Sequence, residues 1–166
     1  KIGNKTTAGK AYSAANIKID SKGVWLTASE MAFCRAEGAL AGWSNMGGSA
    51  KDLYEEGVKL SFEQWGAGSA TAYLADNTST EKNYVDPISE YGGDVSAVSN
   101  ITIKWDDSAT DEQKMERLIT QKWIAMFPNG QEGWSEIRRT GYPKVFPLAQ
   151  STDYSIQVAN RIPFDI

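Results

Sequence analysis

Residues 110–143 read TDEQKMERLITQKWIAMFPNGQEGWSEIRRTGYP, and this stretch decides the fold. Thr110 stands three residues before Gln113, which is the spacing of a capping box, in which each side chain bonds the other residue's free backbone N–H group. Pro128 marks the end of the helix that begins there. The residues that we expect on its inner face, at helical spacing, are Met115, Leu118, Ile119, Lys122 and Met126. For Lys122 we expect only the methylene stem to lie against the core.

A turn and a shorter helix follow this first helix. Asn129-Gly130 is a turn sequence, and a helical pattern continues near 131–139. Gly141 and Pro143 are residues that end helices. Because neither helix could bury its apolar face alone, the sequence predicts that the two pack together as a helical hairpin over 108–143.

A second helical hairpin is predicted over 26–66. Thr27 and Glu30 again have capping-box spacing and begin a helix of about 28–41, and Ser49 caps a helix of about 50–65 after a Gly-rich turn. Two helices of this length joined by a short turn pack antiparallel. The residues of its first helix that we expect to continue the apolar pattern are Met31, Cys34, Ala39 and Leu40.

The remaining segments carry weaker patterns. Residues 1–25 lack helical periodicity and are expected to be extended, as is the tail over 144–166. The loop-rich stretch 67–107 contains one short helical pattern near 70–75 and an alternating run, 100–105, that predicts a short strand. A loop of this length in a compact protein is where we look for ligand contacts.

Composition excludes several classes of function. The 166 residues carry a formal net charge of -4, so the chain has no positive field for nucleic acid. Histidine is absent, which removes Ser-His-Asp catalysis and the common zinc sites, and no cofactor or metal is expected. Cys34 is the only cysteine, so no internal disulfide can form, and we expect it to be a small buried residue.

Aromatic residues are unusually frequent, with six Trp, seven Tyr and five Phe. We expect most of them to lie in the core. Aromatic rings with a polar edge also stack on the C–H faces of sugars. The three rings that we select as ligand contacts, because they lie in the loop-rich stretch, are Tyr84, Tyr91 and Trp105.

Three motifs together resemble the SusD/RagB family. Residues 118–143, LITQKWIAMFPNGQEGWSEIRRTGYP, resemble its C-terminal signature, which is long and specific. Residues 29–43, SEMAFCRAEGALAGW, and residues 54–58, YEEGV, resemble two of its helices in the same order. The matching stretches cover roughly half of the chain. Gly38 departs from the pattern, since the family tends to have Ala there.

The resemblance implies a mainly α-helical, tetratricopeptide-like scaffold with long irregular loops. Members are noncatalytic lipoproteins at the outer-membrane surface, which capture glycans or peptides and pass them to a TonB-dependent SusC-like transporter. Because members are much longer, the sequence is expected to be the C-terminal portion of a larger protein whose lipid anchor lies outside this chain.

Two tryptophans and two arginines of the signature could be taken for a ligand clamp. These are Trp123, Trp134, Arg138 and Arg139. Their helical spacing favours a structural role, with the rings in the core and the guanidinium groups bonded to helix ends or to the carboxylates of Glu30 and Glu37.

Two other functions remain open from the residues alone. Helical hairpins would also suit a protein-interaction scaffold of the helical-repeat kind. A carbohydrate-active hydrolase would need paired carboxylates, but Glu132 and Glu136 read as an ordinary surface pair on one helix face. Asp106, Asp107 and Asp111 lack the spacing of an EF-hand calcium loop and are expected to be solvated.

Overall fold

The computed structural model describes residues 15, 17–21, 23–85 and 94–146. The chain divides into two compact units. The helical unit comprises Lys22–Glu81 and Val98–Val145, and the second unit comprises the remaining three segments. All the described helices belong to the helical unit.

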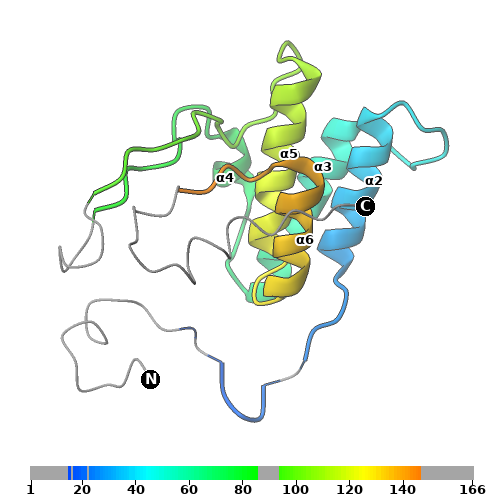
Figure 1. Ribbon diagram of the computed structural model, residues 1–166. Helices are drawn as coiled ribbons and strands as arrows, with labels where there is room; N and C mark the ends of the chain where they lie inside the picture. The colour runs from blue at the N-terminus through cyan, green and yellow to red at the C-terminus, as the bar shows by residue number, and fades with distance from the viewer. Residues whose placement is uncertain (1–14, 16, 22, 86–93, 147–166) are drawn as a thin grey trace. The chain divides into compact units, whose positions relative to one another are not determined.

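The helical unit contains five described helices (Figure 1). They are α2 (Ala28–Leu40), α3 (Ala50–Trp65), α4 (Thr71–Ala75), α5 (Asp111–Ala125) and α6 (Gly130–Thr140). These bounds confirm the four long helices and the short helix that the sequence predicts. Among the described helices, none has both the length and the apolar content that crossing a membrane requires.

Side-chain caps begin each of the four long helices, as the sequence predicts for three of them. The hydroxyl oxygens of Thr27 and Ser49 accept from the backbone N–H groups of Glu30 and Asp52, at 3.0 and 3.1 Å. Thr110 and Gln113 form the complete capping box. The side chain of Asn129 caps α6 by accepting from the N–H of Glu132. Each cap satisfies a backbone donor that the helix leaves free.

The core lies where α2, α3 and α5 pack side by side, and α6 packs on α5 (Figure 1). Phe33, Tyr54, Leu118 and Ile119 are completely buried there. The ring of Tyr54 packs edge-on against Phe33, with 6.1 Å between centroids, and its hydroxyl donates to the carbonyl of Ile103 at 2.6 Å. The buried phenol therefore has the partner that burial requires, and burial also raises its pKa.

Gly57 allows α2 and α3 to approach closely. A Cβ atom at this position would lie 2.8 Å from the Phe33 ring, and the hydroxyl of Ser29 donates to the Gly57 carbonyl at 2.7 Å. The two helices therefore touch through a ring and a buried hydrogen bond at a place where no larger residue fits.

The predicted inner face of α2 is partly wrong. Met31 and Cys34 are exposed, whereas Ala32, Phe33 and Ala36 are buried. Both sets have helical spacing, and the helix is so rich in alanine that apolar residues occur on more than one face. The core selects the face that carries Phe33, because its ring fills the space over Gly57. The expectation that Cys34 is buried fails for the same reason.

The predicted strand over 100–105 is also wrong, because this stretch is irregular. Its backbone groups are occupied by other partners. The carbonyl of Thr102 accepts from Arg117 Nε at 2.9 Å, and the N–H of Lys104 donates to the carbonyl of Asp76 at 2.8 Å. A side chain of α5 and the backbone carbonyl that follows α4 thus take the place of a neighbouring strand.

Replacing Gly57 by leucine should lower the thermal midpoint, because the new side chain meets the buried Phe33 ring and forces the helices apart. Gly130→Leu is the matched control, since a Cβ there meets nothing within 4 Å. We expect a loss of roughly 1–3 kcal/mol for Gly57→Leu relative to the control in urea unfolding. Equal stabilities of the two variants would show that the helices do not pack at Gly57.

Candidate functional site

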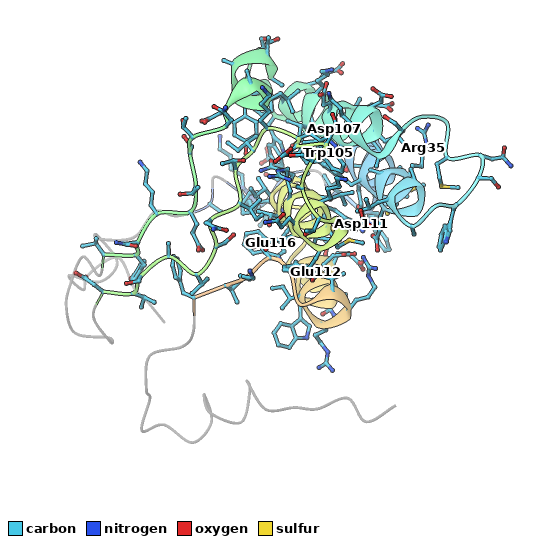
Figure 2. All side chains as sticks on the ribbon, turned by 90° about the horizontal axis from the view of Figure 1, so that it is seen from above. Arg35, Trp105, Asp107, Asp111, Glu112 and Glu116 are labelled. Carbon is cyan, nitrogen blue, oxygen red and sulfur yellow. The ribbon has the colours of Figure 1, made fainter. Side chains whose placement is uncertain are left out.

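Trp105, one of the three predicted ligand contacts, lies in the core of the helical unit. Its side chain is 6% exposed and packs on the Tyr54 ring with 5.2 Å between centroids. Its Nε1 donates to the carboxylate of Asp107 at 3.0 Å, and Figure 2 shows the two residues side by side. The expectation that this ring is exposed is wrong, because Trp105 covers the buried phenol of Tyr54.

The other two predicted contacts lie elsewhere. Tyr84 belongs to the second unit, where it forms an antiparallel bridge with Val95, and its ring lies 6.0 Å from the Phe146 ring. Tyr91 lies outside the described residues. A role of Tyr84 and Tyr91 in ligand binding stays a prediction.

Five of the six tryptophans are exposed. Their exposed fractions run from 40% to 91%, and they are Trp25, Trp43, Trp65, Trp123 and Trp134. The expectation that the signature rings Trp123 and Trp134 lie in the core is therefore wrong. Tryptophans at a surface are candidates for binding. When a ligand or partner covers a large exposed ring, the apolar area removed from water stabilises the complex.

A buried ion network joins α2, α5 and α6. Lys122 Nζ on α5 donates to Glu136 Oε1 on α6 at 2.7 Å, and both side chains are less than a tenth exposed. Arg139 on α6 donates to Glu136 Oε2 at 2.7 Å and to Glu37 on α2 through both terminal nitrogens of its guanidinium group. The structural role predicted for Arg139, with Glu37 as its partner, is confirmed.

The network corrects two expectations. The whole Lys122 side chain is buried, not its stem alone, and Glu136 is buried and not a surface residue. The position of Lys122 within the apolar pattern was the sequence signal for this pair. The carboxylate that accepts from it could not be chosen, because Glu132 and Glu136 lie on the same side of α6 in sequence spacing.

Burial and pairing act in opposite directions on the two charged groups. Burial is the largest single effect on Lys122 and lowers its pKa, but the hydrogen bond and the charge of Glu136, together with Cys34, outweigh it, and the pKa is raised. Burial would raise the pKa of Glu136, but the hydrogen bonds from Lys122 and Arg139 hold it below its usual value. Both groups are therefore charged near neutral pH.

The chemistry of Glu136 does not suit a glycosidase acid. A general acid needs a raised pKa so that it keeps its proton near neutral pH, whereas the pKa of Glu136 is lowered. Among the described residues, no three His, Cys, Asp or Glu side chains gather as they would around a metal ion. Asp106 accepts from the N–H and the hydroxyl of Ser108 and so holds a local turn.

Two hollows open on the helical unit. The groove, as we call the first, is about 570 Å³, lies between α5 and α6, and is lined mainly by apolar residues that include Trp123, Phe127 and Trp134. The second, which we call the network hollow, is about 410 Å³ and opens over the buried ions, with Trp43 among its lining residues. An apolar groove suits a protein segment, whereas a hollow that combines a ring with polar groups suits a hydroxyl-rich ligand.

Comparison with known proteins identifies the family. The family described as "SusD-like: Susd and RagB outer membrane lipoprotein" matches residues 1–165. The chain belongs to the SusD-like family. Comparison with curated proteins finds no match.

Solved SusD-like structures share the fold of this chain. A chitin-binding SusD homolog from Flavobacterium johnsoniae is 52% identical, with a TM-score of 0.71 over 77% of this chain. SusD homologs from Bacteroides uniformis and Bacteroides thetaiotaomicron are 48% and 52% identical, with TM-scores of 0.79 and 0.78 over 84% of this chain. The chain spans 26%, 28% and 29% of the lengths of these three proteins.

Replacing Glu136 by glutamine tests the ion network through pH. A carboxylate whose pKa is lower in the folded state stabilises the fold above its unfolded pKa, near 4.5, and loses this effect as pH falls through the folded value. We expect Glu136→Gln to be less stable by roughly 3 kcal/mol at pH 7. In urea unfolding from pH 7 to pH 3, this difference should shrink below pH 4.5. A difference that stays constant with pH would contradict the assignment.

Proposed function

We propose that this chain is part of a noncatalytic protein that binds glycans at the outer-membrane surface and delivers them to a TonB-dependent SusC-like transporter. The observation that carries the proposal is the 52% identity to a chitin-binding homolog over 77% of the chain. A sugar-binding role also suits an exposed ring such as that of Trp43, which is 69% exposed.

Sugar recognition fits the chemistry of this surface. A tryptophan ring covers the apolar face of a pyranose, and neighbouring carboxylates and guanidinium groups bond its hydroxyls. The net charge of -4 argues against phosphate-rich partners such as nucleic acid. The outer-membrane location is supported by the description of the family as an outer membrane lipoprotein.

A second candidate function is protein binding, which the groove between α5 and α6 favours. The exposed rings of Trp123 and Trp134 line it, and Asn129 supplies the polar side chain of its lining. A protein segment that covers this apolar area would be stabilised by its removal from water. The groove offers few hydrogen-bonding groups to sugar hydroxyls.

Calorimetry with chitohexaose tests the proposed function. We expect saturable binding of the intact oligosaccharide, and no release of reducing ends during long incubation, because the protein binds glycans without hydrolysing them. Maltohexaose and a peptide mixture extend the test to other nutrients. Failure of every glycan to bind would overturn glycan binding, and release of reducing ends would overturn the noncatalytic assignment.

The roles of Tyr84 and Tyr91 are tested in the same assay. We propose that both rings contribute to glycan binding, so Tyr84→Ala and Tyr91→Ala should each weaken the affinity for chitohexaose. Trp105 is left unchanged in this experiment, because its replacement would remove a core side chain. An unchanged affinity in both variants would reject these contacts.

A further inference from the structure

The network hollow lies over the junction of α2, α5 and α6. Its volume is about 410 Å³. Glu37 and Trp43 line it from α2 and the turn that follows, Lys122 lines it from α5, and Glu136 and Arg139 line it from α6. All of these residues belong to the helical unit, so one rigid set of helices forms the hollow.

Trp43 forms an exposed wall of the hollow. Its side chain is 69% exposed, which is unusual for a ring that a folded backbone holds in place. The turn after α2 fixes it: Gly42 takes a φ of +79°, a conformation that glycine adopts without strain, and the N–H of Trp43 donates to the carbonyl of Gly38 at 2.9 Å.

Gly38 makes room for the Trp43 ring against the helix. A Cβ atom at this position would lie 3.1 Å from Trp43 Cε3 and 2.6 Å from Met46 Sδ. This glycine replaces the alanine that the resemblance to the family leads one to expect. The departure therefore coincides with the close approach of Trp43 to α2, and it is a feature of this chain's own sequence.

Ionised groups in balanced number form the floor of the hollow. Glu37 and Glu136 carry two negative charges, and Lys122 and Arg139 carry two positive charges. The four groups bind one another, so the floor has no net charge to attract an anionic or cationic ligand. Arg139 and Glu37 are the outer pair, with side chains 48% and 20% exposed.

The outer pair has hydrogen-bonding capacity left. A guanidinium group has five N–H donors. Arg139 donates three hydrogen bonds, two to Glu37 and one to Glu136. Each carboxylate oxygen can accept more than one hydrogen bond. Donor and acceptor groups held side by side match neighbouring hydroxyl groups of a sugar, each of which both donates and accepts.

We propose that the network hollow is a saccharide subsite for a neutral, hydroxyl-rich pyranose. The sugar stacks on Trp43 and bonds its hydroxyls to Arg139 and Glu37. This inference rests on the proposed glycan-binding function. It adds where on the helical unit the sugar binds and that the sugar is uncharged. The buried pair of Lys122 and Glu136 holds the two contacting side chains in position from below.

Trp43→Ala tests the subsite by calorimetry with chitohexaose. Loss of a stacking ring should weaken affinity about tenfold, which corresponds to about 1.4 kcal/mol. Trp25→Ala is the matched control, since Trp25 is 91% exposed and lies outside the hollow. Trp43→Phe should recover part of the lost affinity because it restores an aromatic face. Thermal midpoints of all variants should stay close to that of the unchanged protein.

Gly38→Ala tests separately whether Gly38 allows the Trp43 ring to lie against α2. Alanine suits a helix better than glycine, and the flexible Met46 side chain can move away from the added Cβ, so the thermal midpoint should not fall. The same Cβ meets the Trp43 ring and displaces it, so chitohexaose binding should weaken. An affinity equal to that of the unchanged protein would overturn the seating role of Gly38.

The outcomes separate the subsite from the proposed function. If the unchanged protein binds chitohexaose and Trp43→Ala binds equally well, the subsite is overturned and glycan binding stands. If the unchanged protein binds no glycan, both fail. Tighter binding of an anionic oligogalacturonate than of chitohexaose would overturn the charge class that the balanced floor assigns.

Discussion

The buried contact between Lys122 and Glu136 is the constraint on which the rest of the helical unit depends. Removing two charges from water costs several kcal/mol, and only close pairing with further hydrogen bonds offsets this. Arg139 and Glu37 supply those further bonds and extend the network from α5 and α6 to α2. The network thereby fixes how the two hairpins meet, which apolar packing alone specifies less sharply.

Most of the large tryptophan rings lie at the surface of the helical unit. Tryptophans face solvent on α3, α5, α6 and the turn after α2. The interior of the bundle is filled by Phe33, Tyr54 and Trp105, and the groove and the network hollow lie outside this core. Both hollows are lined mainly by residues of helices, which hold their lining side chains in place.

The sequence predicted the helices well, because caps and helical spacing are local signals. Thr27, Ser49 and Thr110 each begin a helix where expected. Prediction from the sequence failed where contacts between residues distant in the sequence determine which side chains are buried or paired. The buried face of α2 depends on Gly57 of α3, the carboxylate that pairs with Lys122 depends on the crossing of α5 and α6, and Trp105 is buried by a contact with Tyr54. No sequence pattern indicated that Trp43 would be exposed. The sequence did show glycine at position 38, where the family tends to have alanine.

A double-mutant cycle on Lys122 and Glu136 tests the central claim most directly. Urea unfolding would be measured for Lys122→Met, Glu136→Leu and the double variant. Each single change should cost roughly 3–5 kcal/mol because it deprives a buried charge of its buried partner: Lys122 loses its carboxylate in one variant, and Glu136 keeps only Arg139 in the other. The double change should restore most of that stability. Purely additive effects would contradict the account, since they would mean that the two charges do not depend on each other and that the helices are held together by other contacts.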